Sequence, residues 1–115
     1  MQLINDKLFL DHEDYDTQST SDDDVDSSAT CFIVSPTNNN DAITGFIPNT
    51  GVTGEWKWVI NTSDTNNLIL KHDTGSIAGQ RIFTSAGTDL TLAPFQQAQM
   101  MYIDVGSRMG WWVLN

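Results

Sequence analysis

Large apolar residues alternate with smaller or polar residues along the C-terminal two thirds of the chain. Between Trp56 and Asn61, the residues Trp56, Trp58 and Ile60 occupy every second position. Successive side chains of a strand point to opposite faces, so this segment predicts a half-buried strand with one large apolar face and one mixed face. The same period of two recurs at residues 68–70, 90–92 and 101–105. We expect the tryptophan side of this pattern to pack into a core.

Turn-forming Gly, Asn, Asp and Ser residues separate these alternating runs. The pattern predicts about eight or nine short strands spaced every 8 to 12 residues, with no sustained helical period and at most one helical turn at residues 76–78. Such spacing favours an all-β fold, namely an antiparallel β-sandwich or jelly-roll-like domain over residues 29–115. The predicted strands are residues 29–35, 42–47, 56–61, 68–71, 80–84, 90–93, 100–105 and 111–114.

The N-terminal quarter has a different composition. Nine acidic residues and one base lie in residues 1–26, a net charge of −8 out of −10 for the whole chain. Residues 11–28 contain few large apolar side chains apart from Tyr15 and Val25. Such a segment buries too little to offset its ordering entropy, so we expect residues 1–28 to form an extended acidic arm that is flexible or ordered by a partner. The apolar patch Leu8, Phe9 and Leu10 could be a first strand or an anchor on a neighbouring molecule.

Charge and length exclude several classes of protein. The chain of 115 residues suits one domain, and the strongly acidic balance argues against direct binding of nucleic acid, which requires a basic surface. The single cysteine, Cys31, excludes an internal disulfide framework and indicates a reducing compartment with a buried thiol. The N-terminal residues do not resemble a signal peptide, and no apolar run approaches a membrane span, so we expect synthesis in the cytoplasm without membrane association.

Candidate chemistry is sparse. The run Asp22, Asp23, Asp24 and Asp26 lacks the spaced ligands of a calcium loop, so we interpret it as a solvated charge run and expect no metal. His72 lies near Ser76, but neither stands in a recognisable catalytic setting. We therefore predict neither a catalytic residue nor a cofactor, and no enzymatic activity.

The tryptophans suggest an adhesive surface. Neighbouring side chains of a strand point to opposite faces, so Trp111 and Trp112 cannot both enter one core. One of them is a candidate for a subunit contact or a ligand surface, and we favour the contact. Exposed rings at Trp56, Trp58, Trp111 or Trp112 would instead form a platform for sugar rings.

Several segments resemble a β-rich module of bacteriophage virion proteins, which is found in tail-fibre, head-fibre and capsid-decoration proteins. The resemblance spans residues 42–114, and NNLILKHDTGS (residues 66–76) is its most specific part. Its other parts are AITGF (residues 42–46), VINTSDT (residues 59–65), RIFTSAGTDLTLAP (residues 81–94), and Tyr102, Asp104 and Ser107-Arg108 ahead of Trp111.

This resemblance implies a non-enzymatic virion component that is usually trimeric. The chain has no long repetitive stalk, which favours a decoration, or cement, protein on the outer head surface over a fibre. The expected partners are the major capsid protein and further copies of the chain, with Leu8, Phe9, Leu10, Trp111 and Trp112 as candidate contacts. The alternative is a receptor-binding tail-fibre or head-fibre module that binds glycans; a glycan hydrolase is a more distant option.

Overall fold

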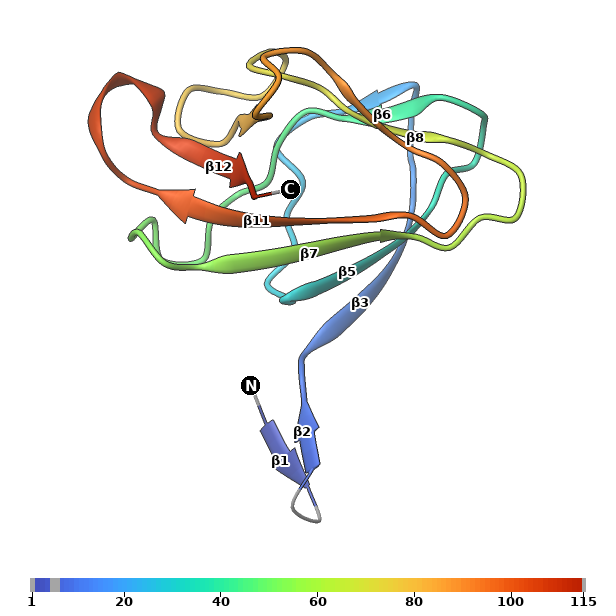
Figure 1. Cartoon of the computed structure of the whole chain (residues 1–115), viewed down its shortest axis with the longest axis horizontal. Helices are drawn as coiled ribbons and strands as arrows, with labels where there is room; N and C mark the ends of the chain where they lie inside the picture. Colours follow the sequence, from blue (N-terminus) through green and yellow to red (C-terminus); the bar gives the residue numbers. More distant parts are fainter. Residues whose placement is uncertain (1, 5–6, 115) are drawn as a thin grey trace.

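The computed structural model describes residues 2–4 and 7–114, with side chains from Leu10 onward. The described residues form an all-β body with one short 3-10 helix, η1 (Gly106–Arg108), and a small hairpin that projects from the body (Figure 1). None of the described helices could cross a membrane. The predicted all-β class is therefore confirmed, whereas the helical turn lies at η1 and not at residues 76–78.

Two sheets make up the body. The small sheet has the order β10-β8-β6-β4 and the large sheet the order β3-β5-β7-β11-β12-β9. The small sheet contains β4 (Ser21–Asp22), β6 (Asp41–Ile43), β8 (Leu68–Leu70) and β10 (Leu90–Leu92). The large sheet contains β3 (His12–Asp16), β5 (Cys31–Ser35), β7 (Trp56–Asn61), β9 (Ile82–Phe83), β11 (Gln97–Ile103) and β12 (Gly110–Val113).

From β3 to β11 the chain alternates strictly between the two sheets. Because a strand of the other sheet lies in each connection, β3, β5 and β7 run parallel to one another, and so do β4, β6 and β8. The pairs β7–β11, β11–β12 and β8–β10 are antiparallel. Both sheets are therefore mixed, and the predicted antiparallel arrangement is wrong: the turn signals locate the strands but do not show which sheet each strand joins.

The core lies between the sheets. Phe32 of β5, Val59 of β7 and Met100 of β11 face it from the large sheet, and Ile43 of β6 and Leu70 of β8 from the small one. A chain of aromatic contacts runs through its middle, in which Phe46 meets Phe32 at 5.0 Å and Trp111 at 6.0 Å, edge to face in both cases. Offset and edge-to-face rings contribute beyond their area of burial, so these rings fix the distance between the sheets.

The strands predicted over residues 29–114 all exist, with ends that differ by one to three residues in most cases. The strand β7 has the predicted bounds. A close backbone approach explains why the segment at residues 42–47 is interrupted: a Cβ on Gly45 would lie 1.9 Å from the Gln80 carbonyl oxygen. Only glycine therefore fits where this segment crosses Gln80 and Arg81.

The acidic segment, which we expected to be flexible or ordered by a partner, is built into both sheets. Its β3 pairs with β5 along five residues, and its β4 pairs with β6. The Asp22 carboxylate accepts hydrogen bonds from the Tyr15 hydroxyl at 2.6 Å and the Gln18 N–H at 2.8 Å, and Asp41 accepts one from Thr17 at 2.6 Å. The carboxylates therefore order the backbone locally, a contribution that counting apolar residues omits.

Only the first residues stand apart. Strands β1 (Gln2–Ile4) and β2 (Lys7–Phe9) form an antiparallel hairpin in which Gln2 is opposite Phe9. The hairpin projects on the side of the large sheet that faces away from the small sheet (Figure 1). The candidate contacts Leu8 and Phe9 lie in β2, and their side chains are outside the described residues.

Candidate functional site: the outer face of the large sheet

The side of strand β7 that faces the core is not the side that its sequence predicts. Lys57 and Val59 are buried at 1% and 0% exposure, whereas Trp56 is 45% exposed. Trp58 and Ile60 are half-buried on the outer side with Trp56. The prediction that the tryptophan side packs into the core is therefore wrong, and the large apolar side chains of β7 lie on the outer face of the sheet.

Lys57 can face the core because its ammonium finds substitutes for water. Its Nζ donates hydrogen bonds to the carbonyl oxygens of Ser27 and Ala29, both at 2.7 Å. Three aromatic rings, those of Phe46, Trp111 and Phe32, lie 5.2, 5.7 and 5.9 Å from Nζ, and their negative faces attract a cation. Burial nevertheless lowers the pKa of Lys57, and nearby carboxylates of Glu55, Glu13 and Asp26 only partly oppose this shift.

Asn61 is the second polar group of the inner face. Its side-chain amide donates to the carbonyl oxygens of Asn66 and Leu92, each at 2.9 Å, and its Oδ1 accepts from the Ser63 N–H at 3.0 Å. These bonds tie the end of β7 to the following loop and to β10 of the small sheet. Two of the inner positions of β7, on either side of Val59, are thus occupied by polar groups whose hydrogen bonds are made within the fold.

The outer face carries rows of apolar side chains across neighbouring strands. Residues directly opposite each other in a sheet share a face, so the register defines these rows. The first row is Trp56, Met101, Trp112 and Phe83; the second is His12, Cys31, Trp58 and Gln99; the third is Asp14, Ile33, Ile60 and Gln97. Most members are half-buried, so the central part of the face is apolar and partly open to solvent.

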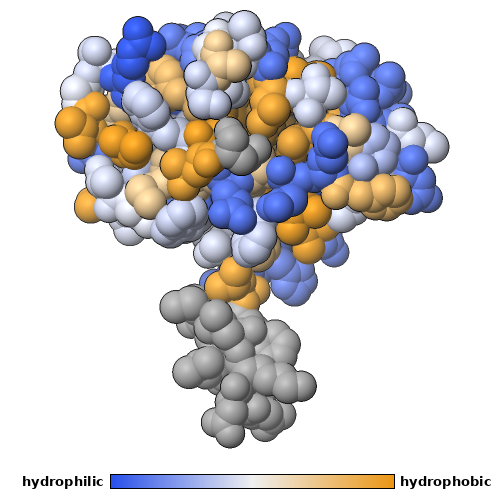
Figure 2. Space-filling model, viewed as in Figure 1, coloured by the Kyte–Doolittle hydropathy of each residue, from blue (hydrophilic) through white to orange (hydrophobic). Residues whose placement is uncertain are grey.

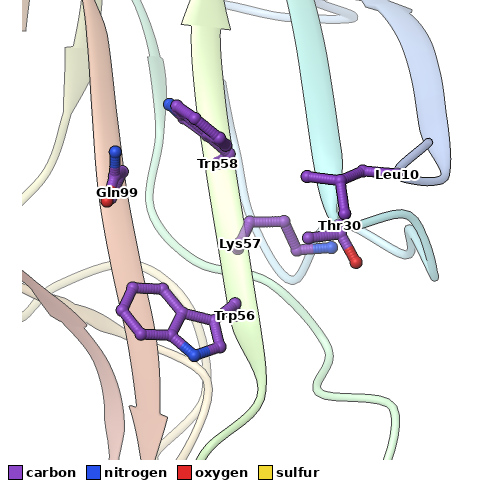
Figure 3. Close-up of a pocket in the computed structure, with 6 residues that line it drawn as sticks. All are labelled: Leu10, Thr30, Trp56, Lys57, Trp58 and Gln99. Carbon is purple, nitrogen blue, oxygen red and sulfur yellow. The ribbon is translucent and has the colours of Figure 1, made fainter. Parts of the chain in front are cut away.

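A pocket of about 370 Å³ lies on this face beside the hairpin. Trp56, Trp58 and Gln99 line its β11 side, and Leu10 and Thr30 approach from the opposite side of β7 (Figure 3). The Trp58 indole N–H donates to the side-chain oxygen of Gln97, which holds its ring against the sheet. In the space-filling view, apolar surface reaches the junction between the body and the hairpin (Figure 2).

The structure separates the two adjacent tryptophans. Trp111 is fully buried, and its indole N–H donates to the Phe46 carbonyl at 2.8 Å, so it is a core residue and does not reach a partner. Trp112 lies on the outer face against Phe83, with ring centroids 5.5 Å apart, and its indole N–H donates to the Arg108 carbonyl. Of the predicted contacts with described side chains, Leu10 and Trp112 lie on the outer face, whereas Trp111 does not.

The residues considered for metal binding and catalysis are engaged elsewhere. Asp23 accepts a hydrogen bond from Thr44, and Asp24 accepts one from the Ile77 N–H. Among the described residues, no three acidic, histidine or cysteine side chains are placed to hold a metal ion. Ser76 is buried and bonded to Thr44, and His72 accepts from the Thr84 N–H, so these two residues do not form a catalytic pair.

Comparisons of the chain with protein-family models, with curated proteins and with solved structures found no match. The outer face is therefore the feature on which a function can be argued. An antiparallel or mixed sheet with one solvated face normally alternates apolar-in with polar-out. Here the inner face of the large sheet packs into the core, and the centre of the outer face is also apolar, with Trp56, Trp58, Ile60 and Met101 in neighbouring positions, which is typical of a sheet covered on both sides.

Proposed function

We propose that this chain is a non-enzymatic structural protein of a bacteriophage virion that decorates the outer surface of the head and stabilises the capsid lattice. In this proposal the two sheets form a β-sandwich body, and the hairpin of residues 2–9 is the arm that reaches a neighbouring molecule. The partners are the major capsid protein and other copies of the chain, without direct contact to nucleic acid or membrane. Assembly takes place in the host cytoplasm.

The observation that carries this proposal is the apolar outer face with a hairpin rising beside it. A hairpin of two three-residue strands is marginal by itself in water, and in the part of the chain that the structure describes β1 pairs only with β2. Both features become stable when another molecule covers them. Repetition over a capsid multiplies weak contacts, so a modest interface suffices for a decoration protein.

The resemblance to phage virion modules adds to this argument. Its most specific segment, residues 66–76, forms β8 and the following turn, where Leu68 and Leu70 enter the core. Its segment at residues 42–46 contains Gly45, whose close approach to Gln80 admits no side chain. The residues that carry the resemblance thus largely build the body, and Phe83 and Arg108, at the outer face, are also among them.

Electron microscopy of phage particles, with an antibody against this chain as the label, tests the proposal. We expect labels distributed regularly over the head. Labels confined to the tail tip would overturn the head assignment in favour of a fibre, and absence from purified particles would overturn the virion assignment altogether.

Removal of the arm provides a second test. Deletion of residues 1–9 should leave the body folded and lower the occupancy of heads, because β3 begins only at His12. Deletion of residues 1–26 is not a suitable comparison, because it removes β3 from the large sheet and β4 from the small sheet. Full occupancy by the shorter variant would exclude the hairpin from attachment.

A receptor-binding module that binds glycans is the second candidate. The observation that favours it is the pocket between Trp56 and Trp58, where aromatic rings and the amide of Gln99 could contact a sugar. Replacing both tryptophans with alanine should then abolish binding to host-cell glycans. Unchanged binding by this variant would eliminate the candidate.

A further inference from the structure

The outer face of the large sheet is a single continuous patch with β7 at its centre. From β3 to β12 the order is β3-β5-β7-β11-β12, so two strands lie on each side of β7. Its most exposed large side chain, Trp56, and its neighbour Trp58 therefore occupy the middle of the patch. Tryptophan at the centre of an interface is a common site of concentrated binding energy.

Charges of opposite sign lie at two opposite corners of this patch. Asp14 and Asp16 lie on β3 at one edge and are exposed. Arg108 is exposed at the far end of β11 and β12, beside Trp112, whose indole N–H its carbonyl accepts. The ion pairs found among the described residues join Lys71 to Asp89 and Arg81 to Asp73, so neither uses Arg108.

We propose that this outer face binds the same face of a second copy of the chain about a two-fold axis that passes over β7. When the axis lies between the two facing sheets and runs perpendicular to the line that joins the charged corners, it exchanges the two corners. Asp14 and Asp16 of each copy then lie opposite Arg108 of the other, around a centre of apolar side chains. A two-fold interface joins one patch to itself, whereas a trimer would require two different patches that complement each other. The face provides one patch.

The size of the patch indicates the strength of the contact. Four strand spacings of about 4.8 Å and about five residues at 3.3 Å give a flat area of roughly 300 Å² per copy, which side-chain relief enlarges. Stable interfaces bury about 800 Å² per partner, so this flat area is less than half of what a stable interface buries and fits a weak, transient contact. We expect a dissociation constant in the micromolar range.

A glycan fits these observations less well than a second copy. The pocket occupies only the part of the face near Trp56 and Trp58, while apolar side chains continue across β11 to Trp112. A sugar needs several hydrogen-bonding groups beside the aromatic rings, and the polar residues that line the pocket are Thr30, Gln99 and Lys57, whose ammonium is bonded to carbonyl oxygens within the fold. The inference deepens one part of the proposed function, the contact between copies of the chain, by naming the face and the symmetry of that contact, and it rests on the proposed function only for that contact.

Sedimentation equilibrium of the full chain from about 1 to 300 µM tests the proposal across the range where a micromolar dimer dissociates. We expect a monomer–dimer equilibrium for the natural sequence. The double variant Trp56→Ser, Trp58→Ser should remain monomeric throughout, with a dissociation constant raised by at least about 100-fold. The matched control is Phe95→Asn, which removes an aromatic side chain that is 72% exposed in the loop before β11 and belongs to none of the rows, and it should dimerise normally.

Charge reversal tests the two-fold geometry separately from the apolar centre. Arg108→Glu alone and Asp14→Lys alone should each weaken the dimer by about 3-fold to 10-fold, since two exposed ion pairs are lost per dimer. The combined variant, Asp14→Lys with Arg108→Glu, should recover most of the affinity. Additive weakening in the combined variant would overturn the proposed pairing of the corners.

Cys31 provides an independent readout because it lies on the outer face opposite Trp58. Its reaction with a thiol reagent should slow as the protein concentration rises, and should not depend on concentration in the double tryptophan variant. Circular dichroism melting of every variant verifies that the fold is retained.

The other outcomes are decisive as well. A natural chain that stays monomeric at 300 µM, or that forms a trimer, overturns the two-fold proposal, and a concentration-independent monomer that binds glycans assigns the face to the sugar. A dimer in solution that is absent from phage particles would instead overturn only the virion function. A protein that is monomeric in solution and present on phage heads would overturn only the two-fold proposal.

Discussion

The two faces of strand β7 differ in a way that reverses the usual rule of burial. The inner face contains Lys57 and Asn61, and both are fully surrounded by protein. The outer face carries Trp56 and Trp58, and both contact solvent in the single chain. The burial of a side chain therefore depends on the partners available to it. Two carbonyl oxygens and three aromatic rings replace water around the Lys57 ammonium, whereas the two indoles of the outer face remain partly in solvent until another molecule covers them.

The largest expected effect is on the inner face at Lys57. Lys57→Ala removes the cation, opens a cavity between three aromatic rings and leaves the carbonyls of Ser27 and Ala29 without their donor. We expect a loss of about 3–5 kcal/mol in the free energy of unfolding, measured by urea titration. The neighbouring Trp56→Ala should cost less than a quarter of this, and equal losses would contradict the difference between the faces.

Asn61, at the other end of β7, tests the same difference between the inner and outer faces. Asn61→Ala removes one acceptor and two donors from buried partners, and the carbonyls of Asn66 and Leu92 lose their bonds. The expected loss is about 2–3 kcal/mol. Thermal unfolding measures it, with the outward-facing Ile60→Ala as the control on the adjacent position. A neutral result would show that water replaces the amide there.

Asp22 extends the comparison to the acidic segment. Its carboxylate accepts a hydrogen bond from Tyr15, which packs against the core beside the inner face of the large sheet. Burial alone would raise the pKa of Asp22, but hydrogen bonds from Tyr15, Gln18 and Ser19 outweigh this and hold it below 3.8. The carboxylate therefore stabilises the fold fully above pH 3.8, and this contribution is lost as the pH falls through its folded pKa. Asp22→Asn should cost about 1–2 kcal/mol at pH 7 and progressively less toward pH 2.

Urea titrations of the natural chain and Asp22→Asn at pH 7, 4 and 2.5 measure this dependence. A deficit that stays constant over that range would mean that the charge of Asp22 does not contribute. Asp64→Asn is the matched control, since its side chain is exposed in the loop after β7, and the variant should have the stability of the natural chain at pH 7.

The smallest effect on stability is expected on the outer face. Trp56→Ser should change the free energy of unfolding of the monomer by less than about 0.5 kcal/mol, because its ring is nearly half exposed. Measurements at about 1 µM, below the expected dimer range, isolate the monomer. A loss above 2 kcal/mol would show that the indole belongs to the core after all.

Period-two alternation predicted the strands of the body but not the direction in which they face. It located β7 to the residue, because Trp56, Trp58 and Ile60 are unmistakable as an alternating set. It could not show that this set faces outward, because the interactions that draw Lys57 inward come from residues up to 54 positions away in the sequence, such as Trp111. Asn61 in the alternate set was the available signal that the mixed face could be buried.

The acidic segment was misjudged for a related reason. Low hydrophobicity and high charge predict disorder when carboxylates meet only water. Here Asp22 accepts hydrogen bonds from Tyr15 and Gln18, which are close in the sequence, and Asp41 accepts one from Thr17, 24 positions away. The first two depend on turn geometry and the third on the packing of distant segments, neither of which composition expresses. The candidate contact Trp112 could be predicted only as one of a pair, because alternation does not show which neighbour faces inward.

The alternation of strands between the two sheets has a kinetic consequence. In the body, only β11 and β12 are both adjacent in the sequence and paired with each other. Every other pair of strands in the body joins segments that are separated in the sequence by at least one further strand. Topologies with such non-local pairings fold in milliseconds to seconds rather than microseconds. During synthesis, β3 and β5 can pair early, but β7 gains its antiparallel neighbour only after β11 has left the ribosome. We therefore expect the large sheet to be completed late, when the hairpin of β11 and β12 adds to the strands already made.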